Sequence, residues 1–162
     1  LNDGQELHAL NAFVVGRRTH VSARYTLSLG SRSELQSSSG VIVSTGAGST
    51  GWVRSVVTGA NRVSAALRKE KSGEPTPDEY ALGWEDRELV YSVREPFISK
   101  TSGASLVFGR IPAQQQLKII SHMPADGVIF SDGVEEDFVA FNSGAVAHVE
   151  IAERCLSLFV PA

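Results

Sequence analysis

The fold of this chain is decided by the stretch Ser39-Gly40-Val41-Ile42-Val43-Ser44-Thr45-Gly46-Ala47-Gly48-Ser49-Thr50-Gly51-Trp52. The β-branched residues 41–43 are typical of a buried strand. The small and hydroxyl residues 44–51 predict a tight turn from this strand into a helix. We expect Ser49 or Thr50 to cap the first helical turn, because a hydroxyl there accepts a hydrogen bond from a backbone N–H. Free N–H groups at the positive end of a helix dipole suit a phosphate-bearing ligand such as a nucleotide.

The residues after Gly51 have the spacing of an amphipathic helix. Steps of three and four separate the apolar positions Val53, Val56, Val57, Ala60, Val63, Ala66 and Leu67. Gly59 lies inside this run and costs a helix about 1 kcal/mol relative to alanine, which leaves open a kink or a break into two helices. The polar segment from Arg68 to Glu79 is rich in Lys, Glu, Pro and Gly, and it predicts a mobile surface loop.

Most of the remaining chain consists of short apolar runs separated by turn residues. The predicted strands are residues 13–16, 24–29, 89–93, 105–108, 117–120, 127–130, 138–141, 146–151 and 156–160. So many short strands favour a mainly β protein, an antiparallel β-sandwich or closed sheet with one helical segment after the glycine-rich turn. Asp132-Gly133 lies between two of the runs and is a strong signal for a hairpin turn.

Length and composition place the chain among ordinary globular domains. Its 162 residues predict one domain, long enough to bury a good core. The net charge of −3 gives no sign of a nucleic-acid-binding surface. The single cysteine, Cys155, cannot form an internal disulfide and favours a reducing, cytoplasmic setting. No apolar run is long enough to cross a membrane and no signal peptide is found, while the start at Leu1 reads as a fragment of a longer protein.

Other candidate chemistry is sparse. The four histidines lack metal-ligand spacing, so we expect no metal site. The turn lacks the lysine of a Walker A loop, and Ser49 is not in a Gly-x-Ser-x-Gly setting. Asp132 is interpreted as a turn residue rather than a catalytic carboxylate, and Asn11 as either a ligand contact or a turn residue. The small residues of the turn also admit a purely structural interpretation, in which they only let a strand turn sharply into a packed helix.

Taken together, these residues resemble the C-terminal domain of NAD kinases. The resemblance rests on Asn11 at the start of a strand, the stretch from Gly40 to Trp52, and Ser131-Asp132-Gly133, in family order over about residues 9–160. In the family the strand start reads Asn-Glu, and the turn reads Asp-Gly, three apolar or small residues, then Ser-Thr-Pro-Thr-Gly-Ser-Thr-Ala-Tyr. Residues 94–112 also resemble the segment that follows the helix in those kinases. The resemblance implies that residues 1–162 form the substrate-binding domain, with the N-terminal α/β ATP-binding domain absent from this chain.

The resemblance also implies a substrate site. Asn11 would bind the adenine end of a dinucleotide, and Thr50 and the backbone of Gly51 would face the same base. Trp52 replaces the family's tyrosine and keeps a stacking surface. Ser55 matches a position that contacts the ligand. No catalytic residue and no metal ligand of the family falls within this chain.

Three departures from the family pattern affect the expected substrate. Ala12 stands where the family has a glutamate suited to ribose hydroxyls, and Ser39 where it has an aspartate. Gly46-Ala47 replaces the pair Pro-Thr or Pro-Ser in the turn. Because hydrogen-bonding partners carry substrate discrimination, the substrate is NAD or another hydroxyl compound, such as a sugar or nucleoside. A non-catalytic ligand-binding module is the alternative from a different class.

The family's activity is phosphoryl transfer from ATP to the 2′-hydroxyl of NAD, which yields NADP. ATP and magnesium are accordingly expected as cofactors of the full-length protein, and neither is expected to bind this chain alone. The family's Gly-Gly-Asp-Gly segment, which activates the hydroxyl and holds ATP, does not occur in these residues. Since phosphoryl transfer depends on positioning and charge stabilisation, we expect the isolated chain to be inactive. By resemblance the protein is a cytoplasmic homo-oligomer with a small-molecule substrate and neither nucleic-acid nor membrane partners.

Overall fold

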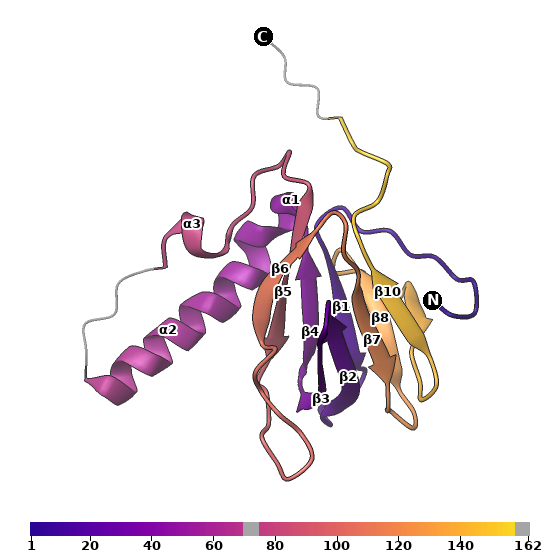
Figure 1. The fold of residues 1–162 in the computed structure, drawn as a ribbon, viewed down its shortest axis with the longest axis horizontal. Helices are drawn as coiled ribbons and strands as arrows, with labels where there is room; N and C mark the ends of the chain where they lie inside the picture. The colour runs from indigo at the N-terminus through magenta and orange to yellow at the C-terminus, as the bar shows by residue number, and fades with distance from the viewer. Residues whose placement is uncertain (70–74, 158–162) are drawn as a thin grey trace.

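The computed structural model describes residues 1–69 and 75–157. Its strands form two antiparallel sheets packed as a sandwich, with a helical segment outside one of them (Figure 1). The strand order is β6-β5-β4-β1-β8-β9 in the larger sheet and β10-β7-β2-β3 in the smaller one. The strands are β1 (Ala12–Arg17), β2 (Ala23–Leu29), β3 (Arg32–Ser38), β4 (Gly40–Ser44), β5 (Glu88–Arg94), β6 (Phe108–Pro112), β7 (Leu117–Ser121), β8 (Gly127–Ser131), β9 (Phe138–Ala140) and β10 (Val146–Val149). The predicted mainly β sandwich is confirmed.

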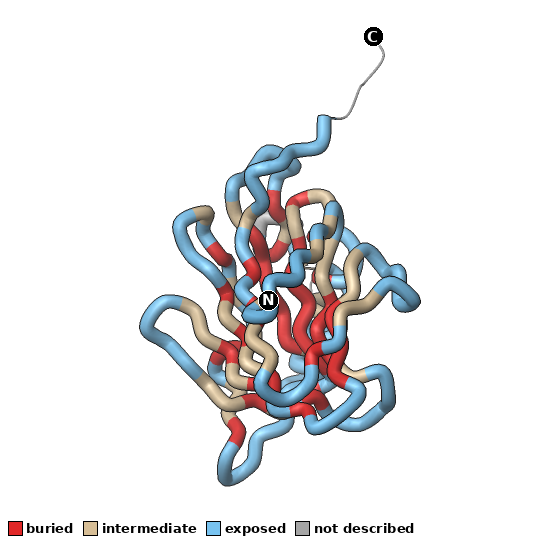
Figure 2. Tube along the Cα trace, turned by 90° about the vertical axis from the view of Figure 1, so that its right-hand side faces the viewer, coloured by how far each residue is buried: buried red, intermediate tan, exposed pale blue. Residues whose placement is uncertain are grey.

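The main hydrophobic core fills the space between the two sheets. The larger sheet contributes Val15, Val41 and Tyr91, and the smaller sheet contributes Leu27 and Ile119, all of them buried. Figure 2 shows buried positions concentrated along the strands, with the connecting loops exposed. Alternate side chains of each strand point to opposite faces, so one face of each sheet supplies this core. Full burial of such a side chain stabilises the fold by about 1.5–3 kcal/mol.

A second apolar cluster lies on the outer face of the larger sheet. Val14, Ile42 and Val90 are the alternate residues of β1, β4 and β5 that face away from the main core. They pack beneath the helical segment and the loop that returns from it, through the buried residues Val53, Tyr80 and Leu82. This cluster fixes where the glycine-rich turn sits on the sheet.

The helical segment begins earlier than the sequence predicts. It comprises α1 (Gly46–Gly48), η1 (Ser49–Val53) and α2 (Arg54–Arg68). Thr45 caps it, because its hydroxyl accepts a hydrogen bond from the N–H of Gly48 at 3.4 Å. The predicted cap at Ser49 or Thr50 is therefore wrong, as both lie inside the segment. The break in helical geometry falls at Gly51, with φ −93° and ψ −110°, while α2 runs unbroken through Gly59.

The predicted helix is confirmed, but most of its apolar face is not covered. Val53 is buried and residues 56–57 pack partly against the outer cluster, whereas Val63 is 61% and Leu67 80% exposed. Figure 1 shows why: α2 extends away from the sandwich after its first turns. The spacing of apolar residues indicates that the segment is helical. How much of the apolar face is buried depends on the tertiary structure.

Most of the predicted strands are present in the structure, and a few are not. The expected runs at 13–16, 24–29, 89–93, 117–120, 127–130, 138–141 and 146–151 correspond to strands, with ends shifted by at most two residues. The run 105–108 is wrong except for Phe108, which starts β6, and β3 was not predicted. Residues 156–157 are not in a strand, and residues 158–160 lie outside the described residues.

The predicted loop from Arg68 to Glu79 also needs correction. Arg68 ends α2, and Pro77–Tyr80 forms the short helix α3, whose Tyr80 is anchored in the outer cluster. Residues 70–74 lie outside the described part of the chain. The apolar contacts of Tyr80 with residues distant in sequence are what hold this segment on the sheet.

Polar side chains at the edge strand β3 tie it to the loop that precedes β6. The Glu34 carboxylate accepts hydrogen bonds from the N–H groups of Ser105 and Leu106 and from Gln36 Nε2, at 2.7–3.0 Å. Burial raises the pKa of Glu34, but these hydrogen bonds outweigh it, so the pKa lies below its usual value. Gln36 and Ser38 are buried and bind the hydroxyl of Tyr25.

Candidate ligand-binding site

The first half of the glycine-rich turn is packed between two distant segments of the chain. A Cβ atom on Gly46 would lie 2.0 Å from the carbonyl oxygen of Gly83, and one on Gly48 would lie 2.1 Å from that of Asn11. Real Cβ contacts are never that short, so both positions require glycine. The structural interpretation of the small residues therefore holds for this half of the turn.

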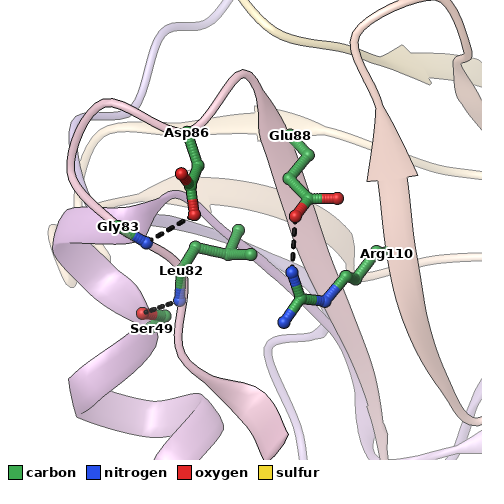
Figure 3. A network of polar contacts seen from close by, with 6 residues as sticks. All are labelled: Ser49, Leu82, Gly83, Asp86, Glu88 and Arg110. Atoms are coloured by element: carbon green, nitrogen blue, oxygen red, sulfur yellow. Dashed lines mark hydrogen bonds and ion pairs between the residues drawn. The ribbon is translucent and has the colours of Figure 1, made fainter. Parts of the chain in front are cut away.

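Ser49 secures the turn from inside. Its buried hydroxyl donates to the carbonyl of Gly46 at 2.9 Å. It also accepts from the N–H of Leu82 at 3.1 Å, as Figure 3 shows. Asp86 accepts from the N–H of Gly83 at 2.6 Å, and the ion pair of Glu88 with Arg110 joins β5 to β6 nearby. Because both of its hydrogen bonds are internal, Ser49 is a structural residue and not a ligand contact.

The second half of the turn is exposed and borders a surface hollow. Thr50, Gly51, Trp52 and Ser55 line a hollow of about 730 Å³ over the start of α2, together with Arg54, Thr58, Gly59 and Pro75. We call this space the α2 hollow. Four of the five predicted substrate-site residues therefore lie together. Ser55, Thr58 and Gly59 lie three and four residues apart on α2 and so share one helical face, with Trp52 three residues before Ser55.

Trp52 gives the α2 hollow an aromatic surface. Its side chain is 46% exposed, and the guanidinium carbon of Arg94 lies 5.9 Å from the ring centroid. The exposed Ser55 hydroxyl donates to the carbonyl of Gly51 at 3.4 Å, which keeps its lone pairs available to a ligand. The exposed hydroxyl of Thr50 makes no hydrogen bond within residues 1–69 and 75–157. An aromatic face beside two hydroxyls is suited to stacking and hydrogen bonding of a planar polar group.

Asn11 does not line the α2 hollow. It precedes β1 at the end of the sheet where Gly48 packs against its carbonyl oxygen. That oxygen accepts from the N–H of Thr45 at 3.0 Å and from the Ser44 hydroxyl at 3.0 Å. The carboxamide of Asn11 is exposed and makes no hydrogen bond among the described residues. Its backbone is thus a structural anchor for the turn, while its side chain is available.

Asp132 holds the start of β1 in place. Its carboxylate accepts hydrogen bonds from the N–H groups of Leu10, Asn11 and Ala12, at 2.7–3.0 Å. Asp132 and Gly133 have φ values of 52° and 80°, and the N–H of Val134 binds the carbonyl of Ser131, as a tight turn requires. The interpretation of Asp132 as a turn residue fits this geometry.

A second hollow of about 860 Å³ lies at one end of the sandwich. We call it the end hollow. Its lining includes Phe13, Val43 and Leu89, which belong to or pack against the main core. Ala12, which stands where the family has a glutamate, also lines it. Among the predicted substrate-site residues, none lines the end hollow. The α2 hollow is therefore the better candidate for the predicted substrate site.

Ser39 lines neither hollow. It precedes β4, at the opposite end of this strand from the glycine-rich turn, and its N–H donates to the carbonyl of Arg94 at 2.9 Å. Its hydroxyl donates to the Glu95 carboxylate. The absence of an aspartate at this position therefore does not change the walls of the α2 hollow.

Sequence reasoning missed Arg54, Thr58, Gly59 and Pro75 as lining residues. The helical period counted from Ser55 identifies Thr58 and Gly59, because positions three and four residues on lie on the same face. No local signal identifies Pro75, since it reaches the hollow only through the path of the chain after α2.

Two general features bear on the chemistry. Within residues 1–69 and 75–157, no group of three or more His, Cys, Asp or Glu side chains is placed to hold a metal ion. Over the same residues, no helix has the length and apolar character needed to cross a membrane.

Comparison with known proteins identifies the fold. No family profile and no curated protein matches the sequence. An NAD kinase from Archaeoglobus fulgidus, solved in complex with ATP, superposes with a TM-score of 0.56 at 18% identity over 90% of this chain and 46% of that chain. Yeast NADH kinase, solved with NADH, superposes with a TM-score of 0.53 at 13% identity over 86% of this chain and 33% of that chain. This chain spans less than half the length of either protein.

These likenesses define the class of the fold. The two antiparallel sheets with one helical segment are those of an NAD kinase-like C-terminal domain. The resemblance carried by the glycine-rich turn is thereby confirmed for the fold, although the sequence is divergent.

Proposed function

We propose that this chain is the substrate-binding domain of an ATP-dependent kinase that phosphorylates a hydroxyl group of NAD or a related compound. The observation that carries the proposal is the division of the glycine-rich turn. Gly46 and Gly48 are closely packed against other segments of the chain, and Ser49 makes internal hydrogen bonds. Thr50 and Trp52, in contrast, are exposed at the α2 hollow. The packing of the fold explains the residue types in the first half of the turn but not those in the second half. The NAD kinase-like fold supports a substrate role for the second half.

In this proposal the ligand's base stacks on Trp52, and the Thr50 hydroxyl with the Gly51 backbone faces its polar edge. Ser55 supplies a hydroxyl to the sugar, and Asn11 reaches the adenine end from the adjoining end of the sheet. The solved NAD kinase holds ATP, and we propose ATP with magnesium as the phosphoryl donor of the complete protein. The chain described here supplies binding, so we expect no phosphoryl transfer from it alone.

One observation favours a second candidate substrate. Ala12 offers no hydrogen-bonding side chain, and its methyl group packs against the outer cluster. A substrate that extends from the α2 hollow to this position would find no side-chain partner there for a ribose hydroxyl, which lowers the affinity for a substrate such as NAD. A kinase acting on another hydroxyl compound, such as a sugar or nucleoside, is accordingly the alternative.

Titration of the folded chain with NAD, NADH, ATP and a neutral sugar tests the proposal. The Trp84→Phe background leaves Trp52 as the sole tryptophan, so its fluorescence reports on the α2 hollow. We expect NAD or NADH to change this fluorescence, and Thr50→Ala and Ser55→Ala to weaken binding. Ser64→Ala, on the same helix but outside the hollow, serves as the matched control. No response to any ligand from a folded chain would contradict the proposed site.

A phosphoryl-transfer assay tests whether this chain binds the substrate without catalysing the reaction by itself. The chain is incubated with ATP, magnesium and NAD, and NADP is measured. We expect no product above the background without protein. NADP formation by the chain alone would show that the chemistry does not depend on a further domain.

We further propose that the protein is cytoplasmic and assembles as a homo-oligomer. Light scattering coupled to size-exclusion chromatography measures the assembly, and a monomeric mass at micromolar concentration would contradict the oligomer for this chain.

A further inference from the structure

The larger sheet ends in the edge strand β6, whose hydrogen-bonding pattern can be read from its pairing with β5. β6 pairs with β5 on one side and is the last strand of the sheet on the other (Figure 1). The N–H of Val93 donates to the carbonyl of Val107 at 2.7 Å, just before β6 begins. Because hydrogen-bonded positions alternate along an antiparallel pair, Gly109 and Ile111 are the residues of β6 that bind β5.

The backbone groups of Phe108 and Arg110 therefore point away from the sheet. On that side they make no hydrogen bond with any residue in 1–69 or 75–157. Both residues are exposed, and the apolar side chain of Phe108 lies at this edge with 40% exposure. A row of unpaired N–H and C=O groups is a template for the addition of another strand.

The other three sheet edges are better protected. On β3, the carbonyls of Leu35 and Ser37 accept hydrogen bonds from the loop between β5 and β6. On β10, Val146 exchanges hydrogen bonds with Asn2. The third edge, β9, has three residues and follows the acidic residues 135–137, and charged residues beside an edge strand discourage pairing. Strand addition is therefore most favourable at β6.

The sequence of β6 suits antiparallel pairing with a copy of itself. When Phe108 of each copy lies opposite Arg110 of the other, the outward groups form two symmetric hydrogen-bonded pairs about a two-fold axis at Gly109. Each aromatic ring then faces a guanidinium, which is a favourable cross-strand contact. The register with Arg110 opposite Arg110 would bring like charges together and would use Pro112, which has no N–H.

We propose that β6 is the contact strand between two copies of this chain, which join their larger sheets edge to edge about a two-fold axis at Gly109. The occupant of the edge is a second copy whose β6 runs antiparallel to the first. This inference rests on the homo-oligomer of the proposed function, to which it assigns an interface, and it does not depend on the substrate.

Proline substitutions at the edge test the interface, because they remove an outward N–H and leave the hydrogen bonds to the neighbouring strand. Arg110→Pro removes such a donor, whereas Arg110→Ala removes the side chain and keeps the donor. Ala140→Pro is the matched control on β9, where the N–H of Phe141 binds the carbonyl of Gly127 and that of Ala140 points outward. Sedimentation velocity over a range of concentrations measures the assembly, and circular dichroism verifies folding.

We expect the unmodified chain and Ala140→Pro to form a dimer with twice the mass of the single chain. Arg110→Pro should dimerise at least about tenfold more weakly than Arg110→Ala, because the symmetric pair loses two hydrogen bonds. A monomeric unmodified chain would overturn the homo-oligomer together with this interface. A dimer that is as strong with Arg110→Pro as with Arg110→Ala, or that is lost with Ala140→Pro, would overturn the interface while the homo-oligomer stands.

Cysteine cross-linking tests the register without a proline. In a Cys155→Ser background, which removes the only native cysteine, chains with Phe108→Cys and chains with Arg110→Cys are mixed and oxidised. Opposed residues of a hydrogen-bonded pair have Cα atoms about 5.5 Å apart, within reach of a disulfide. Two copies of position 110 are diagonal neighbours in this register, about 7–8 Å apart. We expect the mixed disulfide to predominate, and its absence, or a predominant disulfide between two Arg110→Cys chains, would overturn the proposed pairing.

Discussion

Replacing Gly48 with alanine and replacing Gly59 with alanine adds the same methyl group to the same helical segment. The structure predicts opposite effects on stability. At Gly48 the new Cβ would lie 2.1 Å from the Asn11 carbonyl oxygen and 2.6 Å from the Ser44 hydroxyl oxygen. At Gly59 it would meet nothing within 4 Å. The pair of variants therefore separates the packing half of the segment from its exposed half.

The magnitude for Gly48→Ala follows from the contacts that must move. Ordinary contact begins at 3.4 Å, so the turn and the start of β1 have to separate by roughly 1.3 Å. Overpacking of this kind costs about 1–3 kcal/mol. The Asn11 carbonyl also accepts hydrogen bonds from Thr45 and Ser44, each worth about 1 kcal/mol when disturbed. We expect a loss of about 2–4 kcal/mol in the free energy of unfolding.

For Gly59→Ala we expect a gain of about 0.5–1 kcal/mol, because alanine restricts the unfolded chain and adopts helical geometry without strain. Urea unfolding followed by circular dichroism measures both variants against the unmodified chain. At about 2–4 °C per kcal/mol for a chain of this size, the melting temperatures should also move in opposite directions. A Gly48→Ala variant within about 0.5 kcal/mol of the unmodified chain would refute the close approach of the turn to β1.

Other predictions follow from single contacts. Asp132→Ala removes the acceptor of three backbone N–H groups and puts alanine at a φ of 52°, so we expect a loss of about 2 kcal/mol in urea unfolding, with Asp132→Asn milder. The lowered pKa of Glu34 means that its contribution is complete above the unfolded-state pKa and is lost as the pH falls through the lowered value. Glu34→Gln should therefore flatten the drop in unfolding free energy as the pH falls below the usual glutamate pKa of about 4.3, and an unchanged slope would contradict this. Val53→Ala should cost about 2 kcal/mol because Val53 is fully buried, while Leu67→Ala, at an 80% exposed position, should stay within about 0.5 kcal/mol.

The strands that sequence reasoning found are those with a local apolar signal. Residues 13–16, 41–43 and 89–93 are runs of β-branched and aromatic residues, and each forms a strand. The strand β3 was missed because Arg32–Ser38 is mostly polar, with Leu35 as its single apolar residue. It pairs with β2 and buries Gln36 and Ser38 by hydrogen bonding to a tyrosine on that neighbour. Such satisfaction of buried polar groups depends on a partner strand and leaves no apolar pattern in the sequence.

The part of the candidate site that the sequence predicted is likewise the part that depends on local spacing. The motif placed Thr50, Gly51, Trp52 and Ser55 together because they are neighbours on one helical segment, where spacing alone fixes proximity. The place of Asn11 relative to them depends on how β1 and β4 pair. Arg54 carried no motif signal, and only the shape of the surface shows that it borders the α2 hollow.

The sequence by itself determined that a buried strand turns through small residues into a helix within a mainly β domain, because each of these features is local. It left open whether the small residues serve packing or a ligand. The tertiary structure decided that question, residue by residue. Gly46 and Gly48 are pressed against Gly83 and Asn11, which lie 37 residues apart from them in the chain in each case.

 Thr50 and Trp52 are exposed because η1 turns only Ser49 and Val53 toward the sheet. Contacts between distant segments, which no local pattern encodes, thus separate the structural half of the turn from the half that is available to a ligand.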